Sequence, residues 1–289
     1  MLYGVKLILQ TLLGKDQVGR NFGVYPDDTF IISYPRSGST WTRFLVANLA
    51  HPAETVTFAN LDRILPATAV ASRRQLKKIS RPRILKSHNY YDHRYRRVVY
   101  VVRDPRDVVL SEYRFNLKRR TLEDKYPMEQ FVTRFVNGEI GDYGSWKENV
   151  ASWVATRGGS SNFLLLRYED MVADTAREVA KVAVFLGIKA GPEQIASVVE
   201  KSSAEKMRAM EKKESEAWVV TKGGRKDIPF VGAATAGGWK SKLPQESIEE
   251  IEVAWGDIMT QLGYELVTRK AEIAETLLAG ATIRGDRRE

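Results

Sequence analysis

The sequence predicts an α/β fold: a single domain with a central, mostly parallel sheet flanked by helices. Apolar, β-rich runs alternate with helical patterns, and this order places helices on both faces of a parallel sheet. One of these runs leads through a short Gly-containing loop directly into a helical pattern. No internal repeat or long low-complexity linker divides the 289 residues, and a chain of this length can bury a full core in one domain.

Four short apolar runs are the predicted strands. Thr29–Ser33 and Arg83–Lys86 lie in the first third of the chain. Arg97–Val102 is the clearest, because a β-branched run without polar alternation suits a strand covered on both faces. Asn162–Tyr168 is predicted to be another buried strand.

Helices are predicted after three of these strands. Thr40–Ala50 follows the first. Another helix is expected to begin at Asp104 and Pro105, because Asp is a good N-cap and Pro is favoured at the first helical position. A third is expected over Met171–Leu186, where Gly187 ends it.

The domain is predicted to span residues 1–280, with a polar tail over 281–289. Residues 1–20 are expected to form a helical extension. Its apolar part, residues 1–13, is too short to cross a bilayer and allows at most weak contact with a membrane surface. Residues 220–243 are rich in Gly and Lys and are predicted to form a long lid loop.

The composition points to an anionic partner. The chain has 45 basic and 36 acidic residues, a net charge of +9. Nucleic acid, an anionic membrane and a phosphorylated small ligand all fit this balance. Cysteine is absent and only three histidines occur, which argues against thiolate catalysis and against a His-rich metal centre. The lack of cysteine fits a reducing compartment, and we expect a cytoplasmic protein.

The most informative segment, Ile31–Trp41, reads as a strand, a short loop and a helix start. Free backbone N–H groups at a helix start bind anions, and Arg36 adds a cation suited to phosphate or sulfate oxygens. Ser39 and Thr40 can donate hydroxyl hydrogens. A Walker A loop has Lys after its second Gly, whereas Ser39 follows Gly38 here. The segment predicts a P-loop-like phosphate site without an obligatory metal; an ordinary polar turn is the alternative.

Several segments together resemble the cytosolic-type sulfotransferases that use PAPS, a phosphorylated adenosine carrying a sulfuryl group. They occur in the family's order and cover roughly residues 25–265, which is far more specific than any one motif. The matching segments are Tyr34–Trp41 (5′-phosphosulfate loop), Leu85–His88 (catalytic Lys-x-His), Val99–Ser111 (3′-phosphate motif), Leu166–Met171 (adenine-side strand end) and Gly237–Lys240 (Gly-x-Trp-Lys loop).

Elementary geometry agrees with two of these motifs. Arg103 follows a predicted strand, at the sheet edge where open α/β folds bind ligands. Ser111 lies about two turns into the next helix, on the face toward Arg103. Lys86 and His88 are two residues apart at a strand end and so share a face. Without the resemblance, His88 would be read as a structural histidine and Arg103 as a surface ion-pair partner.

The resemblance implies an enzyme that transfers a sulfuryl group from PAPS to a hydroxyl or amine of a small molecule, releasing PAP. His88 would be the general base, while Lys86 and Arg36 would neutralise charge on the leaving group. It implies no metal and no nucleic-acid partner. The implied donor contacts are Arg36, Ser37, Gly38, Ser39, Thr40, Trp41, Arg103, Ser111, Tyr168, Ser202, Trp239 and Lys240. Taken alone, Trp41 also fits a core aromatic and Tyr168 a rim residue.

The chain departs from the family pattern at four places. Arg36 stands where the family usually has Lys. Gly232-Ala233-Ala234 replaces the Arg-Lys-Gly that clamps the 3′-phosphate, and nearby cations could compensate: Lys222, Arg225 or Lys226. Ser202-Ser203-Ala204 lacks the aromatic of Thr-Ser-Phe. Pro244-Gln245 interrupts the family's dimer signature, so the sequence predicts no oligomeric state.

Two other functions remain open from the sequence. One is a P-loop-like kinase or NTPase, although neither a Walker lysine nor a clear magnesium ligand is visible. The other is a non-catalytic protein that binds nucleic acid or membrane. Its basis is the net charge and the basic clusters near residues 94–97 and 118–120, but no nucleic-acid-binding motif accompanies them.

Overall fold

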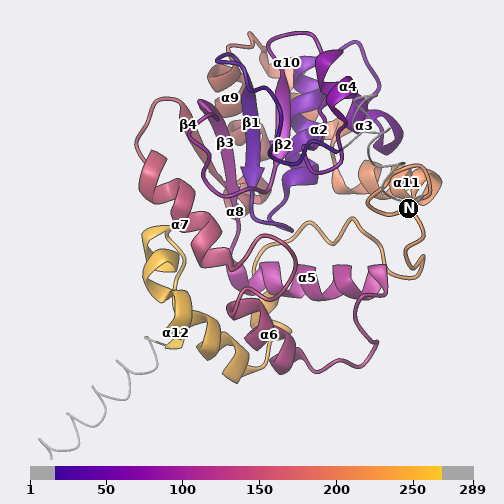
Figure 1. Ribbon diagram of the computed structural model, residues 1–289. Helices are drawn as coiled ribbons and strands as arrows, with labels where there is room; N and C mark the ends of the chain where they lie inside the picture. Colours follow the sequence, from indigo (N-terminus) through magenta and orange to yellow (C-terminus); the bar gives the residue numbers. More distant parts are fainter. Residues whose placement is uncertain (1–16, 269–289) are drawn as a thin grey trace, which may run out of the picture.

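The computed structural model describes residues 17–268, which fold around a four-stranded parallel sheet with helices on both faces (Figure 1). The strand order is β2-β1-β3-β4. The predicted α/β fold with a parallel sheet is therefore confirmed. The strands are β1 (Thr29–Ser33), β2 (Ile84–Ser87), β3 (Arg97–Val102) and β4 (Phe163–Arg167).

Alternating side chains of the central strands enter two separate cores. Phe30 and Ile32 of β1 pack on one face, with α6, α7 and α12, whereas Ile31 packs on the other face, with α2, α9 and α10. The helices are α2 (Ser39–Ala50), α3 (Phe58–Ile64), α4 (Arg73–Lys77), α5 (Pro105–Arg119), α6 (Met128–Val136), α7 (Trp146–Arg157), α8 (Tyr168–Ala173), α9 (Thr175–Leu186), α10 (Pro192–Lys201), α11 (Ala204–Glu214), the 3₁₀ helix η1 (Gly238–Ser241) and α12 (Gln245–Gln261).

Strand β4 corrects one sequence prediction. It was expected to be buried along its length, but only Leu166 is buried and Leu165 is exposed. The reason is position, because β4 pairs only with β3 and forms an edge of the sheet. An apolar run alone does not distinguish an edge strand from a central one.

The helix predicted over Met171–Leu186 is also corrected, because it is two helices, α8 and α9. The first begins at Tyr168, directly after β4. They meet at Asp174, whose carboxylate accepts a hydrogen bond from the Arg177 backbone N–H, 3.0 Å. An Asp that caps the next helix in this way interrupts the preceding one.

Most of the predicted N-terminal extension and all of the predicted C-terminal tail lie outside the described residues. Residues 1–16 and 269–289, including the tail over 281–289, lie outside the described residues. Residues 17–20 were expected to be helical, but they are not. Gln17 forms an antiparallel bridge with Ser72, and the Val18 backbone N–H donates to the Ala71 carbonyl. Across residues 17–268, no helix combines the length and the apolar character that crossing a membrane requires.

Candidate functional site

A cavity of about 620 Å³ lies at the carboxyl ends of β1, β2 and β3, between the sheet and α5. Its volume suits a small ligand. Residues 220–243, which the sequence predicts to be a lid and which we call the lid loop, run alongside α5 (Figure 1). The predicted site residues that line the cavity are Arg36, Gly38, Ser39, Thr40, Trp41, Lys86, His88, Arg103, Ser111 and Tyr168.

The loop after β1 has the geometry of an anion site. Gly38 caps α2 with a φ of 99°, and a Cβ there would lie 2.6 Å from Cδ2 of Tyr168, so only glycine fits. Arg36 also has a positive φ, 61°. The first N–H groups of α2 have no partner within the helix, which leaves them to bind an anion. Ser37 is fully buried and does not line the cavity; within residues 17–268 its Oγ has no hydrogen-bond partner.

Arg36 connects this loop to α5 and to the lid loop. Its Nε donates to Ser111 Oγ at 3.2 Å and its Nη2 to the Phe230 carbonyl at 3.5 Å. The guanidinium lies 4.5 Å from the ring centres of both Phe115 and Phe230. Burial lowers the pKa of Arg36 to about 10, so it remains a cation at neutral pH. The loop therefore presents a fixed positive charge beside Ser111.

His88 is held in one tautomer. Its Nδ1 lies 2.7 Å from the Ser33 carbonyl oxygen, which can only accept, so Nδ1 carries the hydrogen and Nε2 keeps its lone pair. The Tyr143 ring contacts the imidazole edge-on at 5.3 Å. Burial, together with the charge of Lys86, holds the pKa of His88 well below 6.5. The imidazole is therefore neutral at pH 7 and can accept a proton at Nε2.

Lys86 lies beside His88 at the end of β2, and its side chain is buried. Burial, and next the Arg43 guanidinium, holds the pKa of Lys86 well below 10.5. Arg43 is itself buried and pairs with Asp62 at 2.6 Å. Sequence reasoning missed Arg43 and Asp62, which also line the cavity, because no motif links a residue of α2 with one of α3.

Arg103 and two aromatic rings form the next wall of the cavity. The guanidinium of Arg103 lies 4.3 Å from the Tyr168 ring centre and donates to the carbonyls of Arg36 (3.3 Å) and Thr235 (3.4 Å). Trp41 packs edge-on against Tyr168 at 5.8 Å. In the described part of the chain, the buried Nε of Arg103 has no hydrogen-bond partner.

Ser202 supports this wall from behind rather than lining the cavity. It is fully buried, and its carbonyl accepts from Trp41 Nε1 at 3.0 Å. Its Oγ accepts from Asn48 Nδ2 at 3.1 Å. In the structure Ser202 orients Trp41, and its direct contact with the donor stays a prediction.

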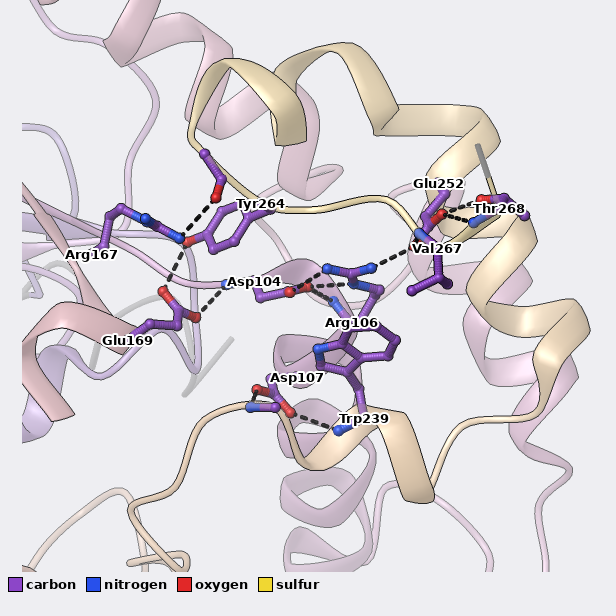
Figure 2. Close-up of polar contacts among 12 residues, drawn as sticks. Asp104, Arg106, Asp107, Arg167, Glu169, Trp239, Glu252, Tyr264, Val267 and Thr268 are labelled. Atoms are coloured by element: carbon purple, nitrogen blue, oxygen red, sulfur yellow. Dashed lines mark hydrogen bonds and ion pairs between the residues drawn. The ribbon is translucent and has the colours of Figure 1, made fainter. Parts of the chain in front are cut away.

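The Gly237–Lys240 turn is tied to the start of α5, as Figure 2 shows. Asp107 accepts from the backbone N–H groups of Gly237 (2.7 Å) and Trp239 (3.0 Å). The Trp239 ring stacks on Arg106 at 3.6 Å. Trp239 is thus buried, Lys240 is exposed, and neither lines the cavity, so their contact with the donor stays a prediction.

Two buried side chains that the sequence analysis did not select hold the lid loop. Lys118 donates to the carbonyls of Arg225 (3.0 Å) and Ile228 (2.7 Å) and lies 3.3 Å from Glu211. Glu211 accepts from the N–H groups of Phe230 (2.6 Å) and Val231 (2.9 Å). Lys118 looked like part of a solvated basic cluster, and only the tertiary structure shows it buried.

The Gly232-Ala233-Ala234 stretch has cations beside it, but not those suggested by the sequence. Arg208 donates to the Gly232 carbonyl at 2.9 and 3.2 Å, and Arg114 Nη1 lies 3.7 Å from where a Cβ on Gly232 would be. Arg225 instead pairs with Asp124 and Asp227, while Lys222 and Lys226 are exposed and do not line the cavity. No group of three or more metal-binding side chains occurs in residues 17–268.

Comparisons with known proteins agree with this architecture. The family model of the sulfotransferase domain matches residues 26–263. Human sulfotransferase 4A1 is 34% identical over 65% of this chain and 69% of its own length. A guinea-pig (Cavia porcellus) 3-alpha-hydroxysteroid sulfotransferase is 31% identical over 68% of this chain and 71% of its own length.

Solved structures share the fold. Retinol dehydratase in complex with androsterone and PAP superposes with a TM-score of 0.68, at 21% identity, covering 84% of this chain and 83% of that one. Mouse sulfotransferase SULT7A1 complexed with PAP also gives 0.68, at 19% identity, covering 86% of this chain and 91% of that one. The kinase and nucleic-acid alternatives are not favoured, since the family match spans most of the chain. This chain belongs to the sulfotransferase domain family.

Proposed function

We propose that this protein transfers a sulfuryl group from PAPS to a hydroxyl or amine of a small acceptor and releases PAP. The observation that carries the proposal is the neutral His88 on the cavity wall, with Nδ1 bound to the Ser33 carbonyl and Nε2 left as a base. Acceptor deprotonation requires such a base within reach of the reacting oxygen.

The residues present fit a donor with phosphates at both ends. The Arg36 loop and the N-terminus of α2 would hold one phosphate. Arg103 and Ser111, which line the same cavity, would hold the other. The Nε atom of Arg103, a residue of the cavity wall, is buried and lacks a hydrogen-bond partner in residues 17–268, as expected at a site that binds a polar ligand. The solved structures of retinol dehydratase and mouse SULT7A1 contain PAP, which supports the proposal.

The proposed step moves one proton and exchanges one bond. The acceptor oxygen bonds to sulfur as the bond from sulfur to the phosphate oxygen breaks, and the acceptor proton passes to Nε2 of His88. Lys86, with its lowered pKa, shares a proton readily with an oxygen on which charge develops. Arg36 supplies a second positive charge at the loop. These cations can perform the charge-balancing role without a metal.

The proposed acceptor is a small molecule, and cytoplasmic location stays a prediction. Two guinea-pig relatives are named hydroxysteroid sulfotransferases, and retinol dehydratase has been crystallised with androsterone and with retinol. These names support a small hydroxyl-bearing acceptor for this chain.

The first test is thermal unfolding with PAP, with ADP, and with ATP plus magnesium. We expect PAP to stabilise the protein most, by about 2.7 kcal/mol at a hundredfold excess over its dissociation constant. An acceptor screen with PAPS would follow. Stabilisation only by ATP plus magnesium would contradict the proposal and favour a kinase.

A further inference from the structure

Among residues 17–268, three carboxylates line the cavity: Asp62, Asp107 and Glu112. The first two have structural partners. Asp62 pairs with Arg43 at 2.6 Å and accepts from Trp218 Nε1 at 3.0 Å. Asp107 accepts from two backbone N–H groups of the Gly237–Lys240 turn. Glu112 is different, because neither the phosphate loop nor the lid loop uses its carboxylate.

Glu112 is only 6% exposed. Within residues 17–268, no hydrogen bond or ion pair reaches its carboxylate; its backbone carbonyl alone accepts a bond, from Asn116. The positive charge of Arg36 acts on this carboxylate through space. Burying a carboxylate without a partner is costly. A ligand group that pairs with this carboxylate would remove that cost and so gain binding free energy.

Glu112 lines the same cavity as Tyr143, a residue beside the proposed base. Burial, and next the charge of Glu112, raises the pKa of Tyr34, whose hydroxyl donates to the Gly144 carbonyl at 3.1 Å. The neighbouring Tyr143 contacts the His88 ring. Glu112, Tyr143 and His88 therefore line one cavity, which a single acceptor can occupy.

The surroundings of Glu112 are otherwise apolar or aromatic. Leu110, Phe115, Met128 and Tyr143 line the same cavity. Burial raises the pKa of Glu112 to about 7, so an adjacent cation would hold it ionised. A single ionisable carboxylate in an apolar wall suits a ligand with an apolar body and one positive charge.

We propose that Glu112 determines acceptor specificity by pairing with an ammonium group, so that the preferred acceptors are hydroxyl-bearing amines with an apolar or aromatic body. The acceptor hydroxyl would meet His88 while its ammonium meets Glu112. This inference rests on the proposed function, since it assigns a substrate class to the same cavity.

The test compares phenols with and without an ammonium group at two spacings. The pairs are 4-hydroxybenzylamine with 4-methylphenol, and tyramine with 4-ethylphenol. Their dissociation constants are measured by calorimetry on wild type and on Glu112→Gln, each with and without PAP. For wild type we expect the better-matched amine to bind on the order of tenfold to a hundredfold more tightly than its neutral partner. In Glu112→Gln this preference should disappear while the neutral phenols bind as before.

Glu205→Gln, an exposed carboxylate on α11, is the matched control and should keep the preference. No amine preference in wild type, or a preference that survives in Glu112→Gln, would overturn the inference. Equal weakening of both members of a pair would also overturn it, because Glu112 would then act by positioning Arg36. PAP stabilisation without amine preference leaves the proposed function standing, whereas failure of PAP to stabilise wild type rejects that function separately.

Discussion

The two walls of the cavity are built in different ways. The wall formed by the ends of β1, β2 and β3 carries Arg36, Lys86, His88 and Arg103, and backbone ladders hold it in register, with Ile32 opposite Ser87 and Ser33 opposite Val101. The wall formed by the lid loop depends on side chains distant in sequence. The first kind of wall follows from local pattern, whereas the second follows only from how the chain packs.

The strand-end wall should carry the chemistry, and His88→Ala tests this with the largest expected effect. Loss of the general base should reduce kcat by about 10²- to 10⁴-fold. Affinity for PAP should be unchanged, because His88 belongs to the acceptor side. The measurements are steady-state kinetics on an identified acceptor and PAP calorimetry, with the exposed His93→Ala as control. A kcat within a few-fold of wild type would remove His88 from the mechanism.

The lid wall should be the more fragile one, and Lys118→Met tests it. The change leaves Glu211 and two carbonyls without their buried partner, which typically costs about 3–5 kcal/mol. We expect a lower free energy of unfolding in urea, faster proteolysis within residues 220–243 and weaker PAP binding. Arg119→Ala, an exposed neighbour on α5, is the control. Wild-type protease resistance would show that Lys118 does not hold the lid.

Glu112 lies on α5, and its titration should appear in stability. Its folded pKa is raised from 4.5 to about 7 by burial, with Arg36 opposing the shift. The folded state therefore holds this proton more tightly than the unfolded chain, and the resulting stabilisation is present below pH 4.5 and lost as pH rises through 7. We compare the free energies of unfolding of Glu112→Gln and wild type at two pH values. Between pH 4.5 and pH 8, this difference should shift by about 3 kcal/mol in favour of Glu112→Gln. Urea unfolding across this range measures it, and parallel curves would contradict it.

The smallest expected effect concerns the cations beside Gly232. If Arg114 compensates for the missing Arg-Lys-Gly, then Arg114→Ala should weaken PAP binding by about twofold to tenfold, since exposed ion pairs contribute little. Lys222→Ala, which removes an exposed lid cation away from the cavity, should leave PAP affinity unchanged. If Lys222→Ala weakens PAP binding and Arg114→Ala does not, then Lys222 compensates for the missing Arg-Lys-Gly, as the sequence first suggested.

The sequence predictions were wrong where a residue's burial or an element's boundary depends on its position in the fold rather than on the local sequence pattern. The apolar run of β4 was correctly identified as a strand, but its place at the sheet edge depends on pairing order. Asp174 divides one helical pattern into two helices. Position also decides the burial of Trp239, whose ring stacks on Arg106, a residue distant in sequence. The sulfotransferase family was identified correctly because several motifs in order constrain one another.

The amino-acid sequence by itself determined the α/β fold, the family, and which residues stand at the ends of the first three strands. Strand patterns, caps and loop motifs are local, and a parallel sheet brings successive strand ends to one edge. Only the tertiary structure decided that Lys118 and Glu211 hold the lid and that Ser202 orients Trp41. It alone showed that Glu112 faces the cavity without a partner in residues 17–268. Burial and pairing depend on segments far apart in the chain, and no local pattern encodes them.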